Sequence, residues 1–273
     1  MSDWHMLEAP AKLNLALVVG SRRPDGMHEV VTVLERLTLA DTIGLRRAEV
    51  TSVDGFDDDT LVRGALDEVT RRVGGATGFE ARIDKRIPVA AGLGGGSSDA
   101  AAALRLANDL LETPLPLDEL DSIAASLGAD VPFFLHEGPQ LGTGDGRTLA
   151  ALTLPRAYTV LLVLPDGTRK HATADVYAAF DERRGEEGYE ERRAHALATL
   201  DDLTAETDLA ALPPNDLAAS PLSEELRRLG AFRADVTGAG PVVYGLFVER
   251  AAAERARDVL GTDLAGSWIA EPR

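Results

Sequence analysis

The pattern of apolar and polar positions near the N-terminus predicts a strand. From Ala11 the sequence alternates and then becomes continuously apolar up to Val19, which is typical of a β-strand. The alternation places Lys12 and Asn14 on one face of this strand, because successive side chains point to opposite faces. That polar face has two interpretations, the lining of a cleft or the solvated face of an edge strand.

The rest of the first half mixes strands and helices. The Arg-Arg-Pro-Asp-Gly segment 22–26 predicts a turn, and the acidic segment 54–59 predicts a helix N-cap. Predicted strands occupy residues 30–34, 42–47, 50–53 and 79–87, and predicted helices occupy about 60–73, 97–111 and 117–127. The segment 128–134 ends the last of these helices and begins an apolar stretch.

The second half reads as strand, helices, strand, strand, helix, strand. Its predicted strands are 158–164, 232–236, 242–248 and 267–270, and its predicted helices are 173–181, one that ends at Leu229, and 250–260. This order is that of the split βαβ arrangement. The mixed-charge stretch 181–193 is predicted to be a solvated helix face or a loop. A domain boundary is predicted near residues 150–156, which gives domains at 1–153 and 154–273, and the mixture of strands and helices in the chain indicates an α+β protein.

Composition narrows the functional classes. The chain has 273 residues, a net charge of −17 and no cysteine. The acidic balance argues against a nucleic-acid partner, and no apolar run is long enough for a membrane span. The absence of cysteine excludes disulfides and thiolate chemistry. We therefore expect a cytoplasmic protein.

One glycine-rich loop gives the strongest chemical signal. Pro88-Val-Ala-Ala-Gly-Leu-Gly-Gly-Gly-Ser-Ser98 leads directly into an alanine-rich helix. Glycines permit close approach to the backbone, and the first amides of a helix form a natural anion site, so a phosphate is the expected ligand. Ser97, Ser98 or Asp99 is predicted to cap this helix. The alternative is a flexible linker. The loop fits neither a Walker A motif nor a dinucleotide fingerprint.

Three stretches together resemble the GHMP kinases: Pro10-Ala-Lys-Leu-Asn14, the loop 88–98 and Thr237-Gly-Ala-Gly-Pro241. Residues 23–28 and 128–134 resemble the members of that family that phosphorylate a cytidine-diphosphate-linked polyol in the non-mevalonate route to isoprenoid precursors. The resemblance implies an N-terminal domain like domain 2 of ribosomal protein S5 and a ferredoxin-like C-terminal domain. It further implies ATP, Mg²⁺ and a small-molecule acceptor alcohol. We expect a monomer or homodimer.

The resemblance also implies residue roles. Asp130 is expected to accept the hydroxyl proton, and Lys12 to stabilise the resulting charge. The residues expected at ATP are Pro88, Ala90, Ala91, Gly92, Leu93, Gly94, Gly95, Gly96, Ser97 and Ser98, with Ser98 also at the metal. The residues expected at the acceptor substrate are Asn14, Met27, His28, Thr173 and Tyr177. A second glycine loop comprises Thr237, Gly238, Ala239 and Gly240.

Several alternatives remain open at this point. The family usually has tyrosine where this chain has Met27, and Asn-Leu where it has Thr60-Leu61. Another small-alcohol kinase, a non-catalytic nucleotide-binding relative and a mevalonate-route decarboxylase therefore remain alternatives. Without the resemblance, Asp130 is a turn residue, His28 a surface residue and Tyr177 a packing residue. The other histidines, His5, His136, His171 and His195, are expected to be structural or exposed.

Overall fold

The chain forms two compact units, each assembled from separated stretches. The computed structural model describes residues 3–74, 78–167, 172–261 and 264–273. Unit 1 comprises Met1–Ala11, Ala40–Val89 and Gly94–Glu137, and unit 2 comprises Lys12–Leu39, Ala90–Leu93 and Gly138–Arg273. The division of the sequence into domains 1–153 and 154–273 stays a prediction.

Two long strands belong to both units. Strand β1 (His5–Arg22) pairs with β2 (His28–Ala48), and the intervening turn is closed by a hydrogen bond from the Arg23 amide to the Met27 carbonyl, 2.6 Å. The sequence predicted two strands, 30–34 and 42–47, where the structure has β2 alone. The polar interruption at Asp41 is fully buried, so it does not end the strand.

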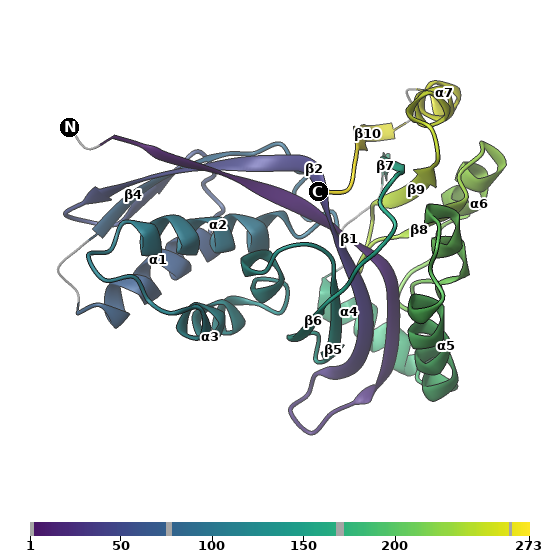
Figure 1. The fold of residues 1–273 in the computed structure, drawn as a ribbon, viewed down its shortest axis with the longest axis horizontal. Helices are drawn as coiled ribbons and strands as arrows, with labels where there is room; N and C mark the ends of the chain where they lie inside the picture. The colour runs from purple at the N-terminus through teal and green to yellow at the C-terminus, as the bar shows by residue number, and fades with distance from the viewer. Residues whose placement is uncertain (1–2, 75–77, 168–171, 262–263) are drawn as a thin grey trace. The chain divides into compact units, whose positions relative to one another are not determined.

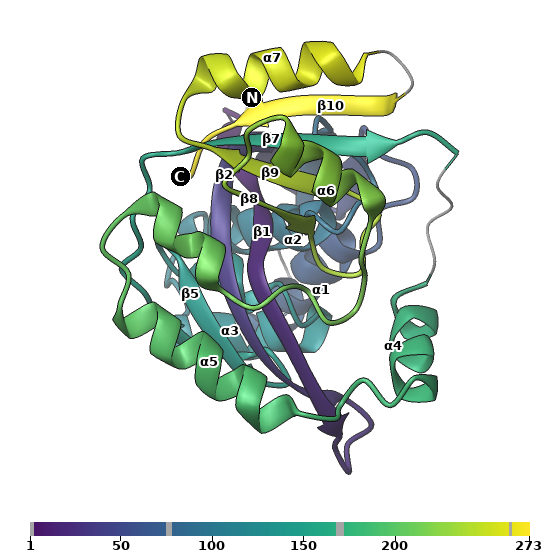
Figure 2. The same ribbon diagram turned by 90° about the vertical axis from the view of Figure 1, so that its right-hand side faces the viewer.

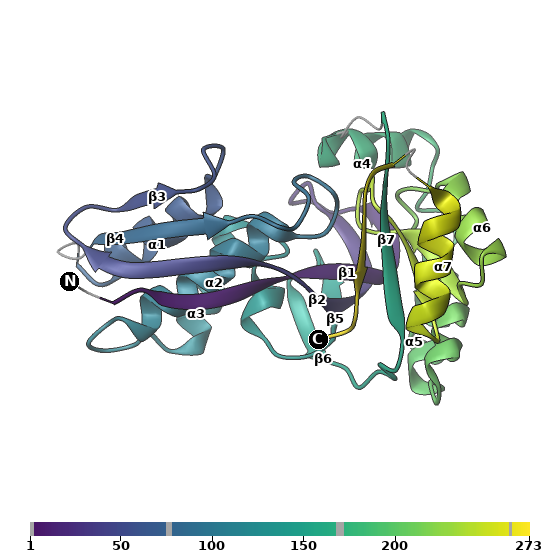
Figure 3. The same cartoon turned by 90° about the horizontal axis from the view of Figure 1, so that it is seen from above.

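Unit 1 places helices on one face of its strands (Figures 1 and 3). Its further elements are β3 (Ser52–Asp54), α1 (Leu61–Arg72), β4 (Gly78–Asp84), α2 (Gly95–Asp109), α3 (Leu117–Leu127) and the 3₁₀ helix η1 (Pro132–Leu135). Residues 42–48 of β2 pair antiparallel with β4, and β3 pairs parallel with it. Alanines 100–103 are buried, and these small side chains let α2 pack closely on α1. Asp59 accepts hydrogen bonds from the Val62 and Arg63 amides, which confirms the predicted cap of α1.

Unit 2 contains a four-stranded antiparallel sheet in the order β10-β7-β9-β8 (Figure 2). Its elements are β5 (Gln140–Gly144), β6 (Thr148–Ala151), β7 (Thr159–Pro165), α4 (Thr173–Glu182), α5 (Tyr189–Asp201), the 3₁₀ helix η2 (Glu206–Ala211), α6 (Pro221–Arg228), β8 (Arg233–Val236), β9 (Val243–Phe247), α7 (Arg250–Leu260) and β10 (Leu264–Ala270). Leu161, Leu226 and Phe247 contribute to the core that joins this sheet to α6 and α7. The predicted split βαβ arrangement and its ferredoxin-like sheet are confirmed.

The elements of unit 2 that were not predicted include α5, β5 and β6. Helix α5 buries only Ala196 completely and is otherwise rich in charge, so its sequence lacks a strong apolar periodicity. Strands β5 and β6 are short, and β5 contains two glycines. Both strands form because residues 30–34 of β2 provide a pairing edge for β5, which in turn pairs with β6.

In the parts of the chain that the structure describes, no helix is long and apolar enough to cross a bilayer.

A carboxyl group lies fully buried on β2. Glu35 is 0% exposed, and its Oε1 accepts hydrogen bonds from the Arg36 amide (2.9 Å) and from Arg156 (3.1 Å). Its Oε2 is buried without a hydrogen-bond partner among the described residues. Burial raises the pKa of Glu35 to about 7, and the Arg156 guanidinium opposes that rise. The folded protein therefore holds a proton here that the unfolded chain releases at lower pH.

We expect Glu35 to make stability fall as pH rises. A carboxyl group whose pKa is raised in the folded state contributes stability below the unfolded pKa of about 4.5 and loses it as pH approaches 7. The free energy of unfolding of wild type, minus that of Glu35→Gln, should fall by about 2–3 kcal/mol between pH 5 and pH 8. Urea unfolding of both proteins at the two pH values measures this difference, and an unchanged difference would contradict the prediction.

Candidate active site

Strand β1 carries a buried lysine and a buried asparagine on one face. Lys12 and Asn14 are 3% and 6% exposed, and Lys12 Nζ donates a hydrogen bond to Asn14 Oδ1 at 2.5 Å. Asn14 Nδ2 donates in turn to Thr32 Oγ1 at 2.8 Å. The alternative of a solvated edge strand is therefore wrong, because both polar side chains are buried. Asn14 is held in one orientation by bonds at its two amide atoms.

The second glycine loop lies directly against this pair. The backbone amide of Asn14 donates a hydrogen bond to Thr237 Oγ1 at 3.1 Å. Gly238 has φ +57°, and a Cβ there would lie 3.3 Å from Lys12 Nζ, a tight contact that glycine avoids. Asn215 holds the backbone of this loop, because its Nδ2 donates hydrogen bonds to the carbonyl oxygens of Val236 (2.9 Å) and Gly238 (2.7 Å). Ala239 is half-buried and Gly240 is buried.

The first part of the glycine-rich loop belongs to the same cluster. The carbonyls of Ala91, Gly92 and Leu93 accept hydrogen bonds from the Val242 amide, from Thr237 Oγ1 and from the Lys12 amide, respectively, at 3.3, 3.4 and 2.9 Å. Ala90 adopts a left-handed φ of 64°, a conformation that costs about 1–2 kcal/mol for a residue with a side chain. Backbone strain of this kind is concentrated at functional sites, which agrees with the predicted phosphate loop.

Gly92 should tolerate no side chain. Its φ is +82°, and a Cβ there would lie 2.3 Å from the Thr237 carbonyl oxygen. We expect Gly92→Ala to lower the free energy of unfolding by about 3 kcal/mol, from backbone strain together with the overlap. Gly138→Ala is the matched control, because Gly138 has φ +70° with nothing within 4 Å of a new Cβ. Its loss should be only about 1 kcal/mol. Equal losses in urea unfolding would contradict the packing role of Gly92.

The second part of the loop begins helix α2 in unit 1. Gly94, with φ 71°, occupies the N-cap position, and no side chain caps the helix. The predicted cap by Ser97, Ser98 or Asp99 is therefore wrong: the helix begins two residues earlier than expected, so these side chains lie inside its first turn. Gly96 is exposed, whereas Gly95 and Ser97 are half-buried. Ser98 Oγ is buried without a hydrogen-bond partner among the described residues, and its role at a metal stays a prediction.

A buried ion cluster joins the two ends of this loop in unit 1. Lys85 Nζ lies 2.5 Å from Asp41 Oδ2 and 2.7 Å from Asp99 Oδ2. The other oxygen of Asp41 accepts the amides of Arg86 (2.5 Å) and Ile87 (2.8 Å), immediately before the loop. Burial raises the pKa of Asp99 to about 7 against the attraction of Lys85. For Lys85, burial lowers the pKa, but Asp99 and Asp41 together raise it above its ordinary value.

The predicted base-binding residues meet in unit 2. The ring of His28 lies 4.7 Å from the ring of Tyr177 with a 30° tilt, and 6.0 Å from Phe180 in an edge-on arrangement. His28 Nε2 lies 2.7 Å from Asp181 Oδ1. His28 is buried, so the alternative of a surface histidine is wrong. Met27 beside it is exposed, and Thr173 is exposed at the start of α4.

The remaining predicted residues range from exposed to buried. Asp130 is half-buried in the turn between α3 and η1 in unit 1, and its catalytic role stays a prediction. Pro88 is half-buried, and Leu93 is buried. Of the other histidines, His136 pairs with Asp121, His195 contacts the Ala211 carbonyl and His5 is exposed, while His171 lies outside the described residues.

Sequence reasoning missed two supporting residues, Asp181 and Asn215. Asp181 stands in the stretch predicted to be a solvated face or loop. Most of that stretch is exposed, as predicted, but two of its residues also make tertiary contacts: Asp181, whose side chain is 42% exposed, bonds the buried His28 ring, and the half-buried Arg192 bonds Asp216 and the Val19 carbonyl. Asn215 follows two prolines, a pattern that indicates a turn and gives no sign of the distant glycine loop it holds. Only the tertiary structure joins these residues to their partners.

Comparison with known proteins identifies similar chains along almost the whole length. Residues 60–138 match the model of the GHMP kinases N terminal domain, and residues 216–265 match that of the GHMP kinases C terminal domain. The 4-diphosphocytidyl-2-C-methyl-D-erythritol kinase of Mycolicibacterium gilvum (strain PYR-GCK) is 38% identical over 96% of this chain and 87% of its own. The enzyme of the same name from Bacillus pumilus (strain SAFR-032) is 37% identical over 88% and 86%.

Solved structures agree with these sequence matches. A crystal structure of 4-(cytidine 5'-diphospho)-2C-methyl-D-erythritol kinase superposes with a TM-score of 0.78 at 28% identity, covering 98% of this chain and 99% of that one. The mevalonate kinase of Methanococcus jannaschii gives a TM-score of 0.77 at 14% identity, covering 99% of each chain. The second likeness shows a shared fold alone.

Proposed function

The chain belongs to the GHMP kinase family of phosphotransferases, and we propose that it transfers the γ-phosphoryl group of ATP to the 2-hydroxyl of 4-diphosphocytidyl-2-C-methyl-D-erythritol. This reaction belongs to the non-mevalonate route to isoprenoid precursors, and we assign it to the cytoplasm. The observation that supports the proposal most is the 38% identity to enzymes of that name over 96% of the chain. The buried Lys12–Asn14 pair between two glycine loops supports the phosphotransfer chemistry.

In the proposed mechanism, Asp130 removes the proton from the acceptor hydroxyl. The hydroxyl oxygen forms a new bond to the γ-phosphorus as the bond from that phosphorus to the β–γ bridging oxygen breaks, and ADP leaves with the released electron pair. Lys12 stabilises the negative charge that develops on the oxygens, which is the main demand of phosphoryl transfer. Asn14 orients Lys12 through the 2.5 Å hydrogen bond and can contact the acceptor.

The phosphates of ATP would be held by the loop 88–98 and the first turn of α2. The exposed Gly96 and the absence of a side-chain cap leave the helix N-terminus able to receive an anion. The buried, unpartnered Ser98 Oγ fits a Mg²⁺ ligand, since Mg²⁺ prefers oxygen. Bound there with the phosphates, Mg²⁺ would supply charge neutralisation. No cluster of three acidic or histidine side chains that could hold a metal occurs among the described residues, which fits an ion that keeps phosphate and water ligands.

The test is ADP release with a panel of acceptor alcohols. We expect turnover with 4-diphosphocytidyl-2-C-methyl-D-erythritol and none with mevalonate, homoserine or galactose. Met27, which is 39% exposed beside the buried His28, stands where the family usually has tyrosine. The panel therefore also tests whether this chain phosphorylates a different alcohol. Turnover of another alcohol without turnover of the cytidyl compound would disprove the substrate and retain the kinase. Absence of ADP release with every acceptor would disprove both.

A further inference from the structure

The buried ring of His28 is hydrogen-bonded to the carboxylate of Asp181. His28 Nε2 lies 2.7 Å from Asp181 Oδ1; the His28 side chain is only 6% exposed, whereas that of Asp181 is 42% exposed. An ionised carboxylate can only accept hydrogen bonds, so Nε2 carries the proton. In the neutral ring, Nδ1 is then an acceptor. Among the residues that the structure describes, Asp181 is the hydrogen-bond partner of this ring.

The ring is also fixed in orientation. Tyr177, Phe180 and Asp181 lie at i, i+3 and i+4 on α4, so all three reach the imidazole from one helix face. Phe180 is 1% exposed and belongs to a core cluster that also contains residues of β1 and β2, among them Leu17 and Val30. The helix is therefore anchored, and rotation of the imidazole would break the Asp181 bond and the stack on Tyr177 together.

We propose that Asp181 is a positioning residue that holds His28 in the Nε2-protonated form and thereby makes the site select cytosine over uracil. Cytosine presents its 4-amino group as a donor at the position where uracil presents a carbonyl oxygen. An unprotonated Nδ1 can accept a hydrogen bond from the amino group of cytosine. Toward uracil the same nitrogen would face a carbonyl oxygen, and neither atom has a proton to donate. This inference rests on the proposed function, because it takes the base of a cytidine diphosphate as the ligand of His28.

Asparagine at position 181 removes the constraint with little change in shape. Its side chain can accept from Nε2 or donate to it, so both neutral forms of His28 become accessible and Nδ1 can also act as a donor. An unpaired buried polar group costs about 1–3 kcal/mol, so discrimination that depends on this one contact should be about 5- to 150-fold. The Asp181→Asn protein should lose most of it.

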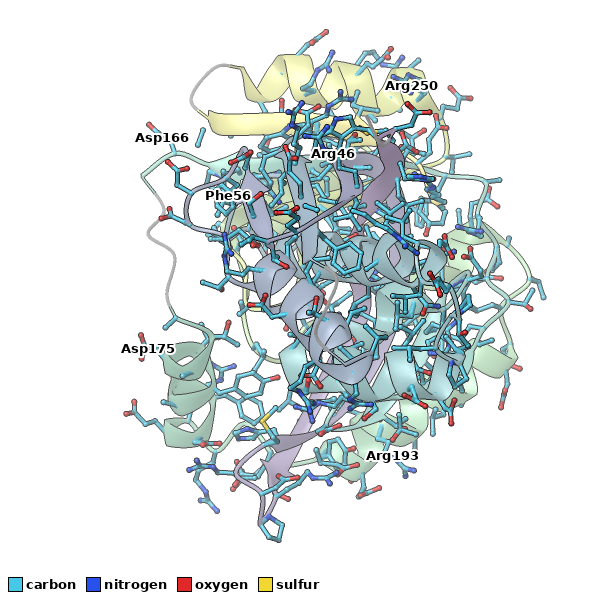
Figure 4. All side chains as sticks on the ribbon, turned by 90° about the vertical axis from the view of Figure 1, so that its left-hand side faces the viewer. Arg46, Phe56, Asp166, Asp175, Arg193 and Arg250 are labelled. Carbon is cyan, nitrogen blue, oxygen red and sulfur yellow. The ribbon has the colours of Figure 1, made fainter. Side chains whose placement is uncertain are left out.

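The experiment measures binding of CDP and UDP by calorimetry at pH 8.5, above the ordinary titration range of an imidazole. We expect wild type to bind CDP at least 10-fold more tightly than UDP, and Asp181→Asn to bring the two affinities within about 3-fold of each other. The matched control is Asp175→Asn, which changes an exposed carboxylate on the same helix (Figure 4) and should leave the ratio unchanged. In steady-state assays, Asp181→Asn should raise KM for the cytidyl substrate and leave KM for ATP unaltered.

The outcomes separate the two proposals. If wild type neither binds CDP nor releases ADP with the cytidyl substrate, the proposed function fails, and this inference fails with it. If wild type prefers CDP and Asp181→Asn keeps the same preference, only the role of Asp181 is overturned. Imidazole ¹⁵N chemical shifts of wild type provide a measurement that does not depend on the variant: a protonated Nε2 and a bare Nδ1 support the inference, and the reverse pattern overturns it.

Discussion

The Asp130→Asn enzyme is expected to turn over about 10³-fold more slowly than wild type, within the 10²- to 10⁴-fold range of a general base. Asparagine keeps the shape of the side chain but accepts no proton at neutral pH, so the acceptor hydroxyl would attack without being deprotonated. KM for ATP should change little, because Asp130 is assigned to the acceptor and not to the nucleotide. Initial rates of ADP release at saturating ATP measure the effect.

A second acidic residue of unit 1 provides the control for this result. Asp67 lies exposed on α1, so Asp67→Asn removes the same charge from the same unit without a proposed role in the site. It should retain wild-type kcat. Should Asp130→Asn also retain it, Asp130 would be an ordinary turn residue, and another group would have to accept the proton.

Lys85→Met should cost about 3–5 kcal/mol of folding free energy, the usual loss when one partner of a buried ion pair is removed. The variant leaves the carboxylates of Asp41 (0% exposed) and Asp99 (2% exposed) without their shared cation. The loss should be larger at pH 8 than at pH 6, since the raised pKa of Asp99, about 7, lets that carboxyl become neutral on the acid side. Urea unfolding at both pH values measures the loss.

Two further variants test the reason for this loss. Lys85→Met combined with Asp99→Asn removes one uncompensated charge and should recover part of the stability. Arg71→Met breaks an ion pair with Glu68 on the surface of unit 1, where the arginine side chain is 66% exposed, and should cost less than about 1 kcal/mol. If Lys85→Met loses no more free energy of unfolding than Arg71→Met, the buried cluster stabilises the protein no more than a surface ion pair does.

Local sequence patterns predicted most of the fold because the elements concerned carry strong periodicity or clear end signals. Helices α3 and α7 begin and end where the sequence predicts, and Asp59 caps α1 from the acidic turn expected to do so. The failures occur where tertiary contacts decide. Asp41 looks like a break in the apolar pattern, yet it stays inside β2 because the Arg86 and Ile87 amides and Lys85 satisfy its oxygens.

The candidate site could be predicted only in part. The Lys12–Asn14 face and the glycine loops have short, dense motifs, and the structure brings Lys12, Asn14, Gly92 and Thr237 together. The supporting partners are single polar residues in stretches without a pattern. Asp181 is 153 positions from His28 in the sequence, so no local signal connects the two.

The way the two units share the chain has a consequence for synthesis on the ribosome. Every segment of unit 1 has been made once residue 137 is added, whereas unit 2 includes segments up to residue 273. The apolar side chains of Leu17, Val19 and Val30 therefore cannot complete their packing until Phe180 and Leu217 have been synthesised, which takes several more seconds at ~10 residues per second. A nascent chain stalled between these points would leave these three apolar side chains without the partners that bury them, which exposes apolar surface to aggregation during this interval.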